Sequence, residues 1–345
     1  MLYDQDITIQ SIIIHNVGNK VNGDNVHYSK KPLVFDEEIN NLLKGYFLSS
    51  FKSSEYYTFY HDIEISMNEV YVSAAKIFDN PETILEESKN IAGHLYRQSN
   101  HPQIKRGELY VVYFNNCIID GETVDAIGLF KSENRDTFLK VYPAGDGFEI
   151  ESQQGVNINK LDKGCLIFNS EKENGYVVSV VDNTNKGAEA QYWIDDFLHI
   201  HQRKDEYYDT QNALTLCKTF IKDELPQKYD VSKADQADLI NKSIKFFKEK
   251  DSFDMEEYQN EVIEQKEIID NFSTFKDNYQ KENEVKIAEK FPISDNAVKK
   301  NARSFKSIIK LDKNFHIYVH GNRNMIEQGS DVKGKFYKVY YEKES

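Results

Sequence analysis

The sequence predicts an α+β protein with a strand-rich antiparallel N-terminal region that also holds helices, a helical middle region and a small C-terminal β/α tail. Short apolar runs separated by Gly, Asp and Asn fill residues 107–182, and their linkers are too short for helical crossovers. From residue 187 the apolar spacing becomes helical, and "IIKLDKNFHIYVHGN" and "GKFYKVYYEK" then return to strand-like runs. These observations disfavour a doubly wound nucleotide-binding fold.

The length of 345 residues suits roughly two domains. We expect a mixed α+β domain with an antiparallel meander over residues 1–186, a helical region over 187–290, and a basic C-terminal β/α segment over 291–345 packed on the rest. The 21 Phe and 22 Tyr indicate a packed core rather than a disordered chain.

The N-terminal region begins with a strand signal at Ile7–Val17, and the turn "NGDN" at 22–25 makes it a hairpin. Asp36 is a suitable cap for a helix that runs to Phe51, and Pro81 suits the start of a helix that ends at Ser99. The first helix has apolar residues at Ile39, Leu42, Leu43, Tyr46 and Phe47. The runs from Gly107 to Asn183, "TFLKVYPAGDGFEIESQQ" among them, then read as one continuous meander.

The middle region reads as a series of amphipathic helices. We expect one over Asp205–Leu225 that ends before Pro226, and one over Ser232–Lys250 that Ser232 caps. "DMEEYQNEVIEQ" and "EIIDNFSTFKDNYQKENE" are further helical pieces, and Ser294–Ser307 is a last short helix.

The N-terminus has no basic start and only a short apolar run, so it predicts neither a secretory signal nor a membrane span. The cysteines Cys117, Cys165 and Cys217 are far apart, without a CxxC pair. We interpret them as reduced thiols of a cytoplasmic protein.

The segment "GAEAQYWIDDFLHIHQRKDEYYDTQNALTLCKTFI" (Gly187–Ile221) concentrates aromatic, acidic and histidine residues, including the single tryptophan. Helical spacing favours a core role for its aromatic residues, so we expect Trp193 to be buried with Phe197 between the two large regions. His199 and His201 have no Cys or carboxylate set at zinc spacing beside them, which disfavours a metal site. The candidate acid/base residues are better explained as helix surface and caps: Asp195, Asp196, Asp205 and Glu206.

Motifs for phosphate-binding loops, dinucleotide folds, zinc proteases and serine hydrolases are missing from the sequence. We therefore predict a protein that is not an enzyme, with no catalytic residue, cofactor or metal.

Charge is distributed unevenly along the chain. The net charge is −14, yet residues 291–345 carry 11 Lys and Arg against 6 Asp and Glu, a net of +5 that leaves −19 on the rest. Within this segment Ala297–Lys313 has six basic residues and one acid. A phosphate could also sit on Ser294 and the amides after it, at a helix N-terminus. The candidate DNA-binding residues are Lys299, Lys300, Arg303, Lys306 and Lys310.

The order of regions, with "AQYWIDDFLHIHQRKDEYYDTQNALTLCKTFI" near the middle and "SFKSIIKLDKNFHIYVH" before a β tail, resembles the 37-kDa nucleoid-associated protein family (NdpA/YejK-like). The resemblance covers nearly the whole chain. It implies a bacterial protein of the cytoplasm and nucleoid, without catalysis. It also implies DNA or chromosome proteins such as a topoisomerase as partners, with room for an oligomer and no role for a membrane.

Three functional hypotheses follow. The first is a nucleoid-associated protein that binds DNA with little sequence specificity through the basic C-terminal segment. The alternative is an acidic protein-interaction module, with Asp251–Asp270 (net −7) as the contact, which acts on a DNA-processing partner such as a topoisomerase without binding DNA itself. An unrecognised enzyme is the third hypothesis, and no constellation of residues supports it.

Overall fold

A computed structural model describes residues 6–184, 192–302, 304–305, 307–312, 314–319 and 323–343. The chain forms two compact units, Met1–Arg203 and Lys204–Ser345. The first unit therefore extends past the expected boundary at residue 186. The cause is that β10 (Ile200–Gln202) pairs with β3 (Tyr57–Phe59) and so belongs to the sheet of the first unit.

One eight-stranded antiparallel sheet organises the first unit, in the order β10-β3-β9-β8-β5-β4-β1-β2. Its centre is the expected meander, because β4, β5, β8 and β9 pair in succession. The other strands of this sheet are β1 (Thr8–Val17), β2 (Val26–His27), β4 (Gly107–Ile119), β5 (Glu122–Ser132), β8 (Lys163–Phe168) and β9 (Val177–Asp182).

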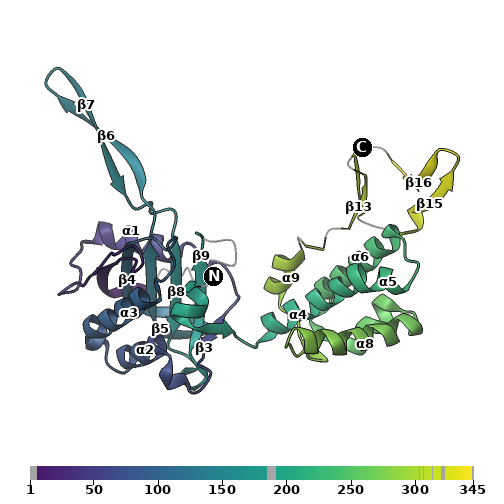
Figure 1. Ribbon diagram of the computed structural model, residues 1–345, viewed down its shortest axis with the longest axis horizontal. Coiled ribbons are helices and arrows are strands. Elements are labelled where there is room, and N and C mark those ends of the chain that lie inside the picture. Colours follow the sequence, from purple (N-terminus) through teal and green to yellow (C-terminus); the bar gives the residue numbers. More distant parts are fainter. Residues whose placement is uncertain are drawn as a thin grey trace. The chain divides into compact units, whose positions relative to one another are not determined.

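Helices cover both faces of this sheet (Figure 1). Along β4, Leu109 and Val111 pack in the cluster with α2 (Glu69–Asp79) and α3 (Ile84–Gln98), while Val112 and Phe114 pack in the cluster with α1 (Glu37–Leu48). The strand is therefore apolar on both sides, as a doubly covered sheet requires. Helices α1, capped by Asp36, and α3 were expected from the sequence, whereas α2 and β3 were not.

Residues 136–155 depart from the predicted meander. They form a separate two-stranded hairpin of β6 (Asp136–Ala144) and β7 (Gly147–Gly155), which projects from the first unit (Figure 1). The strand signal was correct but the expected place in the sheet was wrong, because β5 pairs directly with β8 and leaves no position between them.

Trp193 lies in a π-helical turn, Tyr192–Leu198, and its side chain is fully buried. Its ring centroid is 4.8 Å from that of Phe197, as expected. Both residues belong to the core between the sheet and α2 and α3. Trp193 is therefore a core residue of the first unit, and the predicted place between the two large regions was wrong.

The second unit is built around α4 (Glu206–Thr219), α6 (Lys233–Glu249) and α8 (Lys266–Glu282), which pack around an aromatic core that includes Phe220, Phe247 and Phe272. Ser232 caps α6 through a capping box with Asp235.

The helix that starts at Glu206 continues through Pro226 to Lys228, so the predicted stop was wrong. A π-helical turn at Phe220–Glu224 widens the backbone before the proline and relieves the clash that a regular helix would impose.

Short strands complete this unit. Ala234 and Ala237 of α6 pack in a small apolar core with Ile309, Val319 and Ile326. Asp235 also accepts a hydrogen bond from Arg323 Nε at 2.5 Å. The remaining elements are α5 (Leu225–Lys228), β11 (Ser252–Asp254), α7 (Met255–Tyr258), β12 (Lys290–Pro292), α9 (Asp295–Ala302), β13 (Ile308–Leu311), β14 (Phe315–Tyr318), β15 (Ile326–Asp331) and β16 (Gly334–Val339).

These features confirm the α+β class with an antiparallel sheet, a helical region after it and small C-terminal hairpins. Within the described residues, no helix has both the length and the apolar character needed to cross a bilayer.

His15 on β1 is a buried polar residue whose hydrogen bonds require a neutral ring. The Ser29 N–H donates to its Nδ1 at 3.0 Å, and Ser88 Oγ lies 2.9 Å from its Nε2. Because the Ser88 hydroxyl already donates to the Leu85 carbonyl, Nε2 must carry the proton. Burial, and secondarily the Lys89 ammonium, lowers the pKa of His15 to about 4.

We predict that Trp193→Ala lowers the free energy of unfolding by about 3–5 kcal/mol, because it leaves a cavity in a closed core. Urea unfolding followed by circular dichroism measures the loss. Ile63→Ala is the matched control, because Ile63 is 78% exposed and should cost little. A loss below about 1 kcal/mol for Trp193→Ala would contradict the core assignment.

We predict that His15 makes stability fall as the pH drops from about 6.5 to about 4. Between these pH values His15 is protonated in the unfolded chain but neutral in the folded protein. The free energy of unfolding therefore rises with pH across this range. Below about 4 both states are protonated and the loss is complete. Urea titrations across this range should show a shallower slope for His15→Gln than for the parent; equal slopes would refute the assignment.

Candidate nucleic-acid interface

A hollow of about 470 Å³ lies in the second unit where the π-helical turn at Phe220–Glu224, the start of α6 and β13 meet. We call it the lysine hollow. Its cationic side chains are Lys222, Lys233 and Lys310, its hydroxyl groups come from Ser304 and Ser307, and Asp223 is the one carboxylate in its lining. Ammonium and hydroxyl groups around a concave surface are the donors that a phosphate oxygen accepts from.

Local structure places each lysine at the hollow. The π-helical turn carries Lys222, and Lys233 is the first residue of α6, at the positive end of the helix dipole. Lys310 extends from β13, which packs on α6 through Ile309. Two neighbouring segments of the chain and one strand that is distant in sequence therefore supply the three ammonium groups.

The lysines at this hollow repel one another. Burial and the Lys218 ammonium lower the pKa of Lys222; Lys233 and Lys310 act in the same direction, and Asp223 opposes them. In the part of the chain that the structure describes, Lys222, Lys233 and Lys310 form no ion pair with a carboxylate, and Lys233 donates only to the neutral Gln236 side chain. An entering anion would meet three ammonium groups against the single carboxylate of Asp223, so the hollow keeps a net positive charge.

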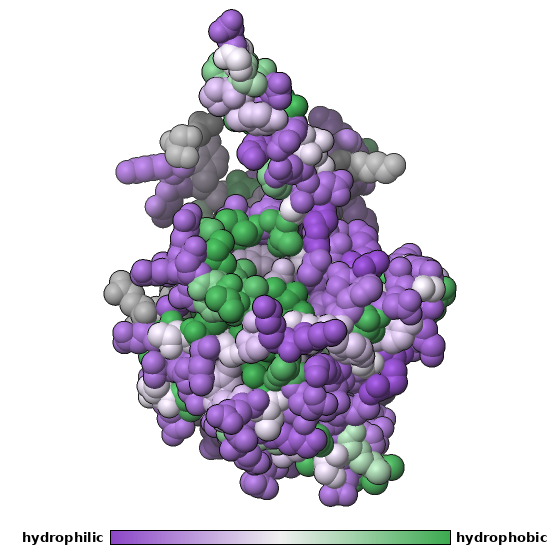
Figure 2. All heavy atoms as spheres, turned by 90° about the vertical axis from the view of Figure 1, so that its left-hand side faces the viewer, coloured by the Kyte–Doolittle hydropathy of each residue, from purple (hydrophilic) through white to green (hydrophobic). Residues whose placement is uncertain are grey.

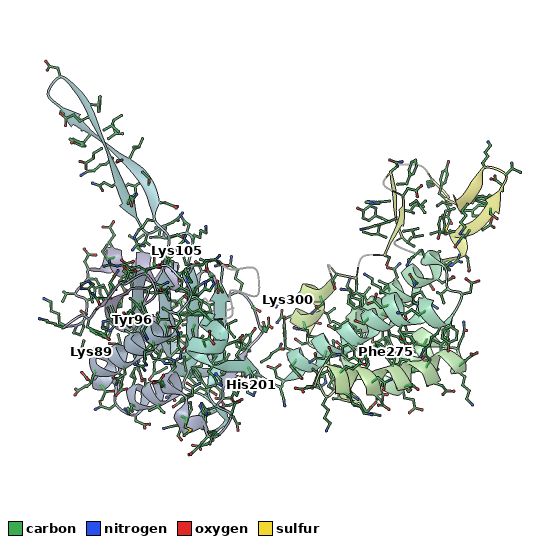
Figure 3. All side chains as sticks on the ribbon, in the orientation of Figure 1. Lys89, Tyr96, Lys105, His201, Phe275 and Lys300 are labelled. Carbon is green, nitrogen blue, oxygen red and sulfur yellow. The ribbon has the colours of Figure 1, made fainter. Side chains whose placement is uncertain are left out.

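The predicted DNA-binding residues are placed as follows. Lys299 and Lys300 are exposed on α9, and Lys310 is exposed at the lysine hollow. Lys300 extends from α9 (Figure 3), and its Nζ lies 5.7 Å from the centroid of the Tyr207 ring. Arg303 and Lys306 lie outside the described residues. Lys222 and Lys233 were missed, because their partner Lys310 is distant in sequence and no local pattern joins them.

The expected phosphate site at the start of α9 is not available. Ser294 is buried, and its own N–H donates to Thr210 Oγ1 at 2.9 Å. Its hydroxyl accepts from the Ala297 N–H at 3.5 Å and so caps the helix. The Ser294 and Ala297 N–H groups are therefore engaged inside the protein and cannot donate to a phosphate.

Basic residues on the first unit are paired with acids. A hollow of about 410 Å³ between α2 and α3 contains Lys76, Lys89 and Arg97. Lys76 pairs with Glu87 at 3.2 Å, Lys89 with Glu86 at 3.1 Å, and Arg97 with Glu69 at 2.7 Å. Because each cation already has a carboxylate, this face attracts phosphate far less than the lysine hollow does.

The acidic stretch Asp251–Asp270 is also partly neutralised. Lys250 pairs with Glu257 and Glu261, and Lys290 pairs with Asp254. Lys242 lies 2.7 Å from Glu264. Four of the eight carboxylates therefore have lysine partners, which weakens the negative surface that the protein-interaction hypothesis requires.

Both histidines of the "HIH" sequence lie beside Tyr60, but only His201 belongs to β10; His199 precedes the strand and has a positive φ of 51°. Tyr60 stacks against both rings, with centroids 4.3 Å from His199 and 4.8 Å from His201. His201, labelled in Figure 3, contacts Thr58 Oγ1 at 3.0 Å. Across the described residues, His, Cys, Asp and Glu nowhere form a group of three suited to a metal.

The candidate acids have ordinary roles. Asp205 caps α4 by accepting from the Tyr208 N–H at 3.1 Å, as the sequence predicted. Asp195 and Asp196 are exposed, and burial, then repulsion by Asp196, raises the pKa of Asp195. The three cysteines are buried and unpaired by disulfides.

A buried charge cluster was not foreseen from the sequence. Lys131 and Lys163 on adjacent strands are fully buried, and Lys131 Nζ donates to Glu133 at 2.8 Å. Lys163 pairs with Asp182 at 3.0 Å, and the Tyr192 hydroxyl donates to Glu133 at 2.9 Å. Burial lowers the pKa of Lys131 and raises that of Tyr192. The cluster fastens the π-helical turn at Tyr192–Leu198 to the sheet.

Comparison with known proteins supports one assignment. Residues 13–338 match the family described as nucleoid-associated protein YejK, which is nearly the whole chain. No curated protein matches the chain. A match of this extent covers the sheet of the first unit, the helices of the second and the segments around the lysine hollow, so the chain belongs to the nucleoid-associated protein YejK family.

Proposed function

We propose that the chain binds DNA directly and with little sequence specificity, and that the lysine hollow is its main phosphate-binding surface. The observation that carries the proposal is the convergence of Lys222, Lys233 and Lys310 on one concave surface without carboxylate partners in the described part of the chain. Family membership supports an association with the nucleoid and a non-enzymatic role.

Charge decides where a phosphate could bind. The chain as a whole is strongly acidic, with a net charge of −14, so its average field repels DNA. A local site must therefore offset this repulsion with several cations that are not already neutralised. Phosphate binding would also relieve the repulsion that lowers the pKa of Lys222.

The hollow offers contacts to the DNA backbone rather than to bases. Lysine ammonium groups and serine hydroxyls bind phosphate oxygens equally well in any sequence. Binding of this kind is salt-sensitive, because each neutralised phosphate releases counterions. We therefore expect modest affinity with weak sequence preference.

The alternative is an acidic module that contacts a DNA-processing protein, such as a topoisomerase, without binding DNA itself. Asp251, Glu256, Glu267 and Asp270 form no ion pair with another described residue, and they are the carboxylates that could meet a basic partner. This alternative ranks second, because the other four carboxylates of the stretch are already paired.

We predict that Lys222→Gln, Lys233→Gln and Lys310→Gln together weaken binding to duplex DNA of any sequence. If each lysine contacts one phosphate, the slope of log K against log salt should become shallower by about 2–3. Fluorescence anisotropy at several salt concentrations measures both effects. The matched control is Lys248→Gln, Lys266→Gln and Lys281→Gln, which removes equal charge from exposed positions outside the hollow. Equal losses for the two triple variants would refute the site; a parent that fails to bind at low salt would favour the acidic-module alternative.

We predict a smaller effect for Lys299→Gln with Lys300→Gln on α9, with a slope change of about 1–2. Both ammonium groups are exposed, but the helix N-terminus beside them is closed by Ser294. The same anisotropy titration tests this ranking. If the α9 pair weakens binding more than the hollow triple, the interface is centred on α9 instead.

A further inference from the structure

The projecting β6–β7 hairpin has two chemically different faces. On one face Lys140 lies 3.8 Å from Glu151, and the Tyr142 hydroxyl donates to Glu149 at 3.2 Å. The pairs Leu139–Ser152, Val141–Ile150 and Pro143–Phe148 lie on the other face, because strand pairing puts directly opposed residues on the same side. Leu139, Val141, Phe148 and Ile150 are 65%, 57%, 75% and 65% exposed.

The exposed apolar face of this hairpin would be stabilised by a bound partner. A two-stranded hairpin alone is marginally stable in water, and it gains little while its apolar face is wet. Its base is held firmly, since Asp162 accepts from the Glu133 and Asn134 N–H groups at 2.7 and 2.8 Å. Residues 136–155 carry a net charge of −3, so DNA is excluded as the partner of this arm.

The body of the same unit carries a second uncovered apolar surface. Ile39 and Leu42 are among the apolar residues that indicated α1, but the side chains that α1 buries are Tyr46, Phe47 and Leu48, with Leu43 partly buried beside them. Ile39 and Leu42 are about two-fifths exposed, and Val34, in the segment before α1, is 88% exposed. Hydrophobic residues also gather on the body of this unit below the hairpin (Figure 2). We call Leu33, Val34, Ile39 and Leu42 the α1 stripe.

The apolar area matches a second copy of this chain. Exposed charges of both signs flank the α1 stripe, Lys30 and Lys31 before it and Asp36, Glu37 and Glu38 along it, so the match lies in area rather than in charge. A large side chain that is about half exposed presents on the order of 100 Å². Four such side chains on the hairpin and four on the stripe offer about 800 Å² per copy, which is what a stable protein interface buries on each partner.

We propose that two copies of the chain form a symmetric dimer in which the apolar face of each β6–β7 hairpin packs on the α1 stripe of the other copy. A two-fold axis uses each surface once per copy, so both apolar surfaces are covered and the assembly closes. The pairing is independent of the lysine hollow, which lies in the second unit, and it gives the dimer two DNA-binding surfaces.

Sedimentation equilibrium of the full chain tests the proposal. The parent should dimerise, and Val141→Ser with Ile150→Ser should weaken the dimer at least about 100-fold, because four apolar side chains are lost from two contacts. The matched control on the polar face of the same hairpin, Tyr142→Ser with Gln153→Ser, should leave the dimer intact. Circular dichroism and thermal melting confirm that each variant is folded.

The reciprocal variants distinguish this pairing from contact between two hairpins. Val34→Ser with Leu42→Ser should weaken the dimer as strongly, whereas Glu38→Ser with Asn41→Ser on the same helix should not. Mixing the hairpin variant with the stripe variant restores one intact contact, so the mixture should associate more tightly than either variant alone. A monomeric parent, a stripe variant that dimerises like the parent, or a mixture without this gain would overturn the proposal.

Discussion

The proposed function depends on which cations the protein leaves without a carboxylate. A chain with a net charge of −14 can hold a polyanion only where bases outnumber the acids around them. The first unit pairs its cations, as Lys76, Lys89 and Arg97 illustrate between α2 and α3. The second unit instead brings Lys222, Lys233 and Lys310 together at one hollow, where burial and then the repulsion by nearby lysines lower the pKa of Lys222. Association with the nucleoid is then compatible with an acidic composition.

The two proposed binding surfaces lie on different units of the chain. In the first unit, a sheet covered on both faces and closed by Trp193 supports a projecting arm, the β6–β7 hairpin, whose exposed apolar face is the proposed contact with a second copy. In the second unit, a π-helical turn and the first residue of α6 present lysines beside a C-terminal strand. Each unit has its own core, so the arm and the lysine hollow can be altered independently.

Local patterns in the sequence were enough for the fold class and for many helix starts, because caps such as Asp36, Asp205 and Ser232 act within a few residues. They failed where tertiary structure decides. Nothing local says that β5 skips the next hairpin to pair with β8, or that a π-helical turn carries a helix through Pro226. The basic C-terminal segment was found by counting charges, and Lys310 proved to be part of a hollow. Lys222 and Lys233 could not be found, because only folding brings them beside it.

Lysine reactivity measured with and without DNA tests directly whether the lysine hollow is the surface that binds DNA. Mild acetylation of the full chain, read residue by residue by mass spectrometry, reports which ammonium groups a bound phosphate backbone covers. The account predicts that duplex DNA protects Lys222, Lys233 and Lys310, while Lys76 and Lys89 of the first unit, already paired with acids, keep their reactivity. Protection of Lys76 and Lys89 with unchanged reactivity at the lysine hollow would contradict it.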